Sequence, residues 1–159
     1  HDGIGIAANQ IGVPLQIFLM EALTSKKQER YQDLPQVSFH LFINPRIIKA
    51  STNLLSFWHG CLSAKSQDYG ELATYQWVDY EAKDLNLAPL RGQVEGMSAV
   101  IFQHEFRHLL GGTYVDYAKN FLSLEKLEEK MNLQETKNLK PCGKEIPHIL
   151  SDYKLGDKI

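Results

Sequence analysis

The sequence predicts an α+β protein in which antiparallel β-sheets pack around one central helix. Apolar β-rich runs in the first half of the chain and a later helical period of three to four residues indicate this fold class. With 159 residues, of which 43% are hydrophobic, the chain can bury one sizeable core. We therefore expect residues 1–159 to form a single domain.

Two apolar runs, LQIFLM at residues 15–20 and HLFINP at residues 40–45, predict paired strands. The polar residues 24–36 between them suit a connecting loop. A third strand is expected over residues 71–82, ELATYQWVDYEA, with side chains alternating between two faces. One of these faces would carry Leu72, Thr74, Gln76 and Val78.

The apolar pattern changes to a helical period at about Gln93. Steps of three or four residues place one set on a single helical face: Val94, Met97, Ile101, His104 and His108. Gly111 and Gly112 would end this helix. A second amphipathic helix is expected over residues 123–133, and residues 138–159, with two prolines and two glycines, are expected to form an irregular tail.

Charge and composition argue against several classes of protein. The net charge is -2 and no basic stripe occurs, so dedicated nucleic-acid binding and membrane-surface binding are not indicated. The longest apolar stretch, residues 14–23, is too short to span a bilayer, and the first residues lack the features of a secretory signal. We therefore expect a cytoplasmic protein, in which the two cysteines, Cys61 and Cys142, remain reduced.

The segment QHEFRH at residues 103–108 contains the pattern H-E-x-x-H. One turn of helix brings His104 and His108 within reach of a single cation, while Glu105 lies to the side and can take a proton from a bound water. The alternative is a helix without a metal site, in which His104 is a core residue and His108 is half exposed. Two imidazoles on the core-facing side are costly to bury without a partner, so we favour a metal site.

A catalytic metal requires a third protein ligand, and the residues leave three options. The position used by metzincins is Tyr114, which does not suit the role. A thermolysin-like site would use Glu128 or Glu129, which lie among other charges on an expected solvated face. Cys61 stands in a loop that could close on the helix, although a free cysteine is often only a small buried residue.

Three segments in this order resemble the motifs of the peptide deformylase family. They are GIGIAANQ at residues 3–10, GCLS at residues 60–63 and QHEFRH at residues 103–108, against G-x-G-x-A-A-x-Q, E-G-C-L-S and Q-H-E-x-x-H. The resemblance covers about the first 116 residues. It implies a deformylase-like fold and a hydrolase that removes the formyl group from N-formylmethionyl peptides, with transient contact to the ribosome. It also implies one divalent metal ion, typically Fe²⁺, with Zn²⁺ or Ni²⁺ as alternatives.

The resemblance implies that Cys61, His104 and His108 bind the metal and leave a fourth position for water. Glu105 would be the general base that activates this water and then protonates the leaving amine.

The side-chain amide of Gln10 and the backbone N–H of Leu62 would bind the oxyanion that forms from the formyl group. The substrate would contact six residues: Ile4, Gly5, Phe57, Gly60, Met97 and Val100.

Four positions depart from the family pattern. Asn9 stands where proline is usual, so we expect a looser loop around Gln10. His59 replaces a glutamate and would give the Cys61 loop a group that titrates near pH 6.5. Thr74 lies near the place of a common arginine, and Arg107 takes the place of a frequent aspartate.

The chain begins almost at the first motif, so the N-terminal helix and strand of the family are expected to be absent from this sequence. The departures leave a second interpretation open, a divergent deformylase-like protein with little or altered activity. A zinc endopeptidase is the third and weakest interpretation.

Overall fold

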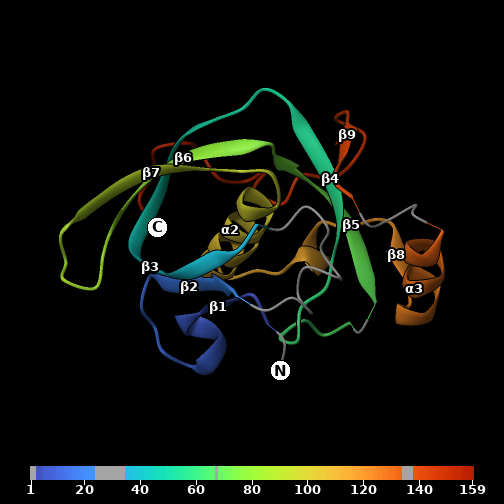
Figure 1. Cartoon of the computed structure of the whole chain (residues 1–159), viewed down its shortest axis with the longest axis horizontal. Coiled ribbons are helices and arrows are strands. Elements are labelled where there is room, and N and C mark those ends of the chain that lie inside the picture. Colours follow the sequence, from blue (N-terminus) through green and yellow to red (C-terminus); the bar gives the residue numbers. More distant parts are fainter. Residues whose placement is uncertain (1–2, 24–34, 67, 134–137) are drawn as a thin grey trace.

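Two antiparallel sheets surround the long helix α2 in the computed structural model, which describes residues 3–23, 35–66, 68–133 and 138–159 (Figure 1). The first sheet has the order β1-β2-β3-β6-β7 and consists of Gly5–Ala7, Ile17–Ala22, Val37–Ala50, Trp77–Lys83 and Pro89–Glu95. The second has the order β8-β5-β4-β9 and consists of Phe121–Leu122, Tyr69–Tyr75, Leu54–His59 and Lys140–Cys142. The helical segments are η1 (Ala8–Ile11), α2 (Gly96–Leu109), η2 (Tyr114–Asp116) and α3 (Leu124–Asn132). The α+β prediction is confirmed.

Aromatic side chains fix α2 against the first sheet. The ring centroid of Phe102 lies 4.9, 5.1 and 5.2 Å from those of Phe18, Phe42 and Tyr80, which come from β2, β3 and β6. Aromatic pairs at these separations attract each other beyond the effect of area burial. Truncating Phe102, which is fully buried, to alanine would cost about 3–5 kcal/mol of stability. This packing sets the position of the helix that carries the two candidate histidine ligands.

The predicted pairing of the first two apolar runs is confirmed, because β2 and β3 are antiparallel neighbours. Most of the predicted loop between them, residues 24–34, lies outside the described residues.

The prediction of one strand over residues 71–82 is wrong. The chain leaves β5 at Tyr75 and enters β6 at Trp77, and these strands belong to different sheets. The exposed Gln76 forms the corner, where its backbone N–H donates to the hydroxyl of Ser51 at 2.8 Å. Within β5 both faces are buried, because Ala73 is as fully buried as its neighbours Leu72 and Thr74. Helix α2 packs on β5, and the backbone around Pro147 pairs with the edge of β5 at Ala73.

Helix α2 begins at Gly96 rather than at Gln93, because β7 continues to Glu95. Gly96 has φ +57°, a left-handed conformation that glycine adopts readily, and the chain turns there from strand into helix. The other end follows the prediction: the helix stops at Leu109, and Gly111 has φ +83°.

The second predicted helix is confirmed as α3, with Leu127 buried and Ser123 as the N-terminal cap. The expectation of an irregular tail is only partly right. Residues 140–142 form strand β9 against β4, and Ile149 and Leu150 are buried in the core. Neither helix in the described ranges has the length and apolar character needed to cross a bilayer.

Candidate metal centre

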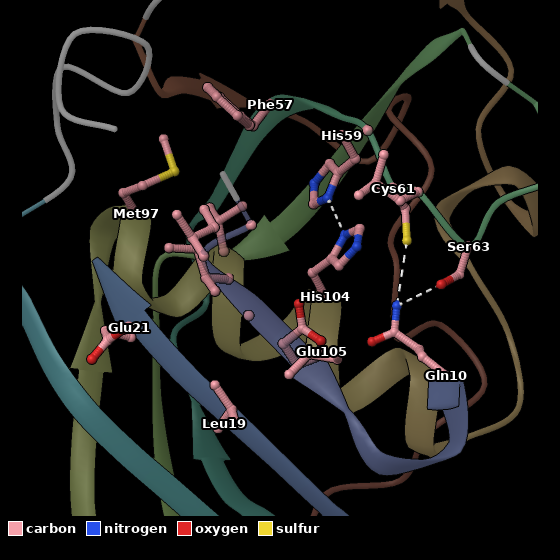
Figure 2. Close-up of a pocket in the computed structure, with 18 of the residues that line it drawn as sticks. Gln10, Leu19, Glu21, Phe57, His59, Cys61, Ser63, Met97, His104 and Glu105 are labelled. Atoms are coloured by element: carbon pink, nitrogen blue, oxygen red, sulfur yellow. Dashed lines mark hydrogen bonds between the residues drawn. The ribbon is translucent and has the colours of Figure 1, made fainter. Parts of the chain in front are cut away.

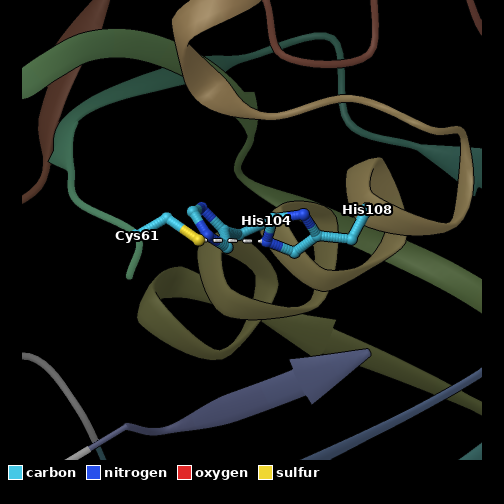
Figure 3. A group of neighbouring side chains, drawn as sticks. All are labelled: Cys61, His104 and His108. Atoms are coloured by element: carbon cyan, nitrogen blue, oxygen red, sulfur yellow. Dashed lines mark hydrogen bonds between the residues drawn. The ribbon is translucent and has the colours of Figure 1, made fainter. Parts of the chain in front are cut away.

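The structure brings Cys61, His104 and His108 together, as the sequence predicted (Figure 3). One ligand atom from each lies within 4.8 Å of the others, and Sγ of Cys61 is 3.3 Å from Nε2 of His108. A tetrahedral ion with ordinary Zn–S and Zn–N bond lengths would separate these two atoms by about 3.6 Å. The trio therefore fits a transition-metal ion.

Local contacts place the three side chains. Strand β4 ends at His59, and Cys61 follows in a turn that is closed by a hydrogen bond from Ala64 N–H to the Cys61 carbonyl at 3.1 Å. A Cβ at Gly60 would lie 2.4 Å from the Tyr69 ring, so glycine is needed for this path of the chain. On the helix, the buried amide of Gln103 donates to the Tyr75 carbonyl and accepts from its N–H, both at 2.9 Å. This pair of bonds ties the helix to the second sheet next to His104.

Burial tunes the charge state of the three groups. It lowers the pKa of His108 to about 4 and that of His104 well below its usual value, so both imidazoles are neutral at pH 7. Neutral imidazole is the form that binds a metal. Burial also raises the pKa of the Cys61 thiol, which a bound cation would reverse by favouring the thiolate.

Glu105 lies on α2 where the helix meets β1. A Cβ at Gly5 would be 2.5 Å from its Oε1, so only glycine lets β1 approach this closely. Burial raises the pKa of Glu105 to about 8, and its Oε2 is buried without a hydrogen-bond partner in the described part of the chain. A carboxyl group with a pKa near neutrality can both accept and deliver a proton at pH 7.

Gln10 points its amide toward the candidate metal ligands (Figure 2). Its Oε1 accepts from the Ala7 N–H at 2.7 Å, so its Nε2 is left to donate to the Ser63 hydroxyl at 3.0 Å and to Cys61 Sγ at 3.7 Å. The expectation that Asn9 loosens this loop is wrong. The Asn9 side chain donates to the backbone carbonyl of His108 and so fastens η1 to the end of α2.

His59 is buried and faces His104, with 3.1 Å between their Nδ1 atoms and 9° between the ring planes. Burial lowers its pKa to about 4, well below the value near 6.5 that the sequence predicted. Thr74 is also buried, and its hydroxyl donates to the Leu55 carbonyl at 3.4 Å. Arg107 forms an ion pair with Asp152 of the C-terminal segment at 2.6 Å.

A cavity of about 710 Å³ opens over this group (Figure 2). All six predicted substrate contacts line it: Ile4, Gly5, Phe57, Gly60, Met97 and Val100. Gln10, Leu62, His104 and Glu105 line it too, with the Leu62 side chain exposed. Sequence reasoning missed Leu19, Glu21, Trp58 and Tyr69, which also line it. Leu19 and Glu21 alternate along β2, beside β1, but no motif marks them.

Among the described residues, neither Glu128 nor Glu129 belongs with the two histidines to a group that could hold a metal ion. Glu128 and Glu129 are exposed on α3. Tyr114 is buried and its hydroxyl donates to the Asp68 carbonyl. The thermolysin-like option therefore has no support in the described geometry.

Comparisons with known proteins agree with this geometry. The model of the family described as polypeptide deformylase matches residues 1–123. A peptide deformylase of Aquifex aeolicus is 37% identical over 131 residues, covering 80% of this chain and 72% of that protein. One of Leptospira biflexa is 34% identical over 119 residues, covering 75% and 65%. The Met-Ala-Ser-bound structure of a class I type b peptide deformylase from Acinetobacter baumannii has a TM-score of 0.64 and 26% identity, covering 72% of this chain and 69% of that one.

The chain thus spans about two thirds of the length of these relatives. The family match favours deformylase chemistry over an endopeptidase, and the family is metal-dependent, in keeping with the cysteine and histidine trio. The chain belongs to the polypeptide deformylase family.

Proposed function

We propose that this protein hydrolyses the formamide bond of N-formylmethionyl peptides. The observation that carries the proposal is the meeting of Cys61 with the two histidines of α2, next to Glu105 and at the edge of a largely apolar cavity. Family membership supports the same reaction.

Cys61, His104 and His108 would hold one divalent ion, bound through Sγ and two imidazole nitrogens. When bound, such an ion polarises a water molecule and the formyl oxygen. Thiolate ligation suits a softer cation than Mg²⁺ or Ca²⁺. We take Fe²⁺ as the native ion, with Zn²⁺ or Ni²⁺ able to occupy the same ligands.

The protein would supply proton transfer and charge stabilisation. Glu105 takes a proton from the attacking water as the new C–O bond forms, and it gives that proton to the amine nitrogen as the C–N bond breaks. The products are formate and the free amino terminus. The Nε2–H of Gln10 and the backbone N–H of Leu62 donate to the formyl oxygen as negative charge develops there, an effect worth about 3 kcal/mol per donor.

The cavity would orient the substrate. The methionine side chain lies against Ile4, Phe57, Met97 and Val100, and the extended peptide pairs with backbone atoms of Gly5 and Gly60. The Acinetobacter relative that was solved with Met-Ala-Ser supports this class of ligand. Because formylmethionine begins nascent chains, the proposal includes action in the cytoplasm and transient contact with the ribosome.

Formate release tests the proposal. Anaerobically iron-loaded protein is given formyl-Met-Ala-Ser, and acetyl-Met-Ala-Ser serves as the matched control. We expect formate and Met-Ala-Ser from the first peptide and no deacylation of the second. Cleavage between amino acids would indicate an endopeptidase instead, and fully metal-loaded protein that releases no formate would contradict the proposal.

A further inference from the structure

His59 lies beside the candidate metal ligands but has no part in the chemistry proposed above. Its Nδ1 is 3.1 Å from Nδ1 of His104, so one of these nitrogens donates a hydrogen bond to the other. The direction of this hydrogen bond decides where the remaining proton of His59 lies.

Metal binding by His104 sets the direction. Because Nδ1 of His104 is turned to His59, only its Nε2 is left for a metal. A neutral imidazole that binds through Nε2 carries its proton on Nδ1, and metal-binding histidines usually donate this proton to a neighbouring acceptor. His104 is therefore the donor and Nδ1 of His59 the acceptor. Because the accepting Nδ1 of His59 carries no proton, the one proton of its imidazole must lie on Nε2.

This Nε2–H is a buried donor without an acceptor. His59 is 4% exposed, and its Nε2 has no hydrogen-bond partner among the residues that the structure describes. His59 lines the same cavity as Phe57 and Met97, and it follows Phe57 by two positions on β4, so both project from one face of the strand. Figure 2 shows the His59 ring between Cys61 and the side chains of Phe57 and Met97. A ligand atom that accepts this hydrogen bond would relieve the cost of burying the donor.

We propose that His59 determines specificity for the first side chain of the substrate, by donating its Nε2–H to an acceptor atom in that side chain. This inference rests on the proposed function. The ligand class is a linear side chain of methionine length with an acceptor near its end. The thioether sulfur of methionine is such an acceptor, and the oxygen of methionine sulfoxide is a stronger one. Norleucine has the same length, but its methylene group leaves the donor unpaired.

Binding of product-like peptides tests this directly. The dissociation constants of Met-Ala-Ser, norleucine-Ala-Ser and methionine-sulfoxide-Ala-Ser are measured by calorimetry on zinc-loaded protein. We expect methionine to bind about fivefold more tightly than norleucine, the ratio that one modest hydrogen bond provides. The sulfoxide should bind at least as well as norleucine despite its greater cost of desolvation.

Variants at position 59 separate the donor from the shape of the cavity. In His59→Leu, methionine and norleucine should bind equally and the sulfoxide should bind most weakly. In His59→Gln, whose amide can still donate, the preference for methionine should return. Met97→Leu is the matched control, because it alters the same cavity without removing a donor and should change the affinities for methionine and norleucine together. Metal content is measured in each variant, so that loss of the ion is not mistaken for loss of specificity.

Equal binding of methionine and norleucine by the wild-type protein would overturn the role of His59 and leave the proposed function untouched. If metal-loaded His59→Leu still prefers methionine over norleucine, the role of His59 is overturned as well. If none of the three peptides binds, the inference fails. Formate release then decides separately whether the proposed function fails with it.

Discussion

Sγ of Cys61 lies 3.3 Å from Nε2 of His108, although 47 residues separate them along the chain. Cys61 comes from the loop after β4 and His108 from the last turn of α2, so this contact joins the second sheet to the central helix. A neutral thiol and a neutral imidazole gain little from this approach. Binding of one metal ion by both side chains would explain why they lie so close together.

Removal of Cys61 should remove the metal. Purified wild-type protein is expected to carry about one transition-metal ion per chain, and Cys61→Ala should lose most of it because two histidines alone hold an ion weakly. Elemental analysis measures this. Cys142→Ala is the matched control, since Cys142 pairs with Leu54 at the opposite end of β4 from Cys61. Equal metal content in the two variants would contradict the assignment of Cys61.

Loss of the Asn9 side chain should slow the reaction without removing the metal. Asn9 donates to the His108 carbonyl and so couples the helix end to the loop that carries Gln10. We expect Asn9→Ala to lower kcat by about tenfold, equivalent to about 1.4 kcal/mol, with the metal content unchanged. Asn86→Ala, at an exposed position in the turn after β6, is the control. If the kcat of Asn9→Ala equals that of the wild-type protein, the hydrogen bond does not position Gln10.

The ion pair between Arg107 and Asp152 should stabilise the fold. Arg107 is buried, its guanidinium also lies over the Tyr117 ring at 4.9 Å, and its partner is half exposed. Asp152→Asn leaves a buried positive charge with a weaker acceptor, so we expect a loss of about 1.5–3 kcal/mol in the free energy of unfolding. Chemical denaturation measures it, and Glu128→Gln on the exposed face of α3 should change little. Equal unfolding curves for both variants and wild type would contradict this role.

Acid should destabilise the protein partly through His148. Burial lowers its pKa in the folded state to about 4, whereas an exposed histidine titrates near 6.5. Between these two pKa values the unfolded chain therefore binds up to one proton more than the folded chain. The free energy of unfolding is unaffected by the titration of His148 above pH 6.5 and falls as the pH is lowered toward 4, by at most about 1.4 kcal/mol per pH unit.

Replacement of His148 tests the sign of this effect. The Nδ1 atom of His148 accepts from the Leu150 N–H at 3.0 Å, and the amide oxygen of His148→Asn can accept the same bond. The variant should lose less stability than wild type when denaturation is compared at pH 7 and pH 5. His40→Asn, at an exposed position on β3, is the control. A variant that loses as much stability as wild type on acidification would contradict the prediction.

The parts of the site that could be predicted are those that depend on the spacing of residues within one helix. His104, Glu105 and His108 share one turn of α2, and helical geometry alone places two imidazoles together. Cys61 required the resemblance of three ordered motifs, since spacing does not show which loop closes on the helix. The contact between His59 and His104 could not be predicted, because it depends on how the end of β4 packs on α2.

The errors in the predicted fold have the same physical origin. The corner at Gln76 is made by Ser51, which lies 25 residues earlier and accepts the Gln76 N–H, and alternation of side chains within residues 71–82 contains no sign of it. The partner of Arg107, Asp152, lies 45 residues later, in a segment whose prolines and glycines predicted irregular structure. The corner at Gln76 and the ion pair of Arg107 depend on tertiary contacts, which the local periodicity of the sequence cannot predict.

Formate release by wild-type protein and by Glu105→Gln, both loaded to the same iron content, tests the proposed mechanism most directly. In the proposed mechanism Glu105 moves the proton and is not one of the three ligands, so the variant should keep its metal. We predict that wild-type protein releases formate from formyl-Met-Ala-Ser, and that Glu105→Gln is slower by a factor on the order of a hundred or more. Equal rates for the two proteins, or no formate from fully metal-loaded wild type, would contradict it.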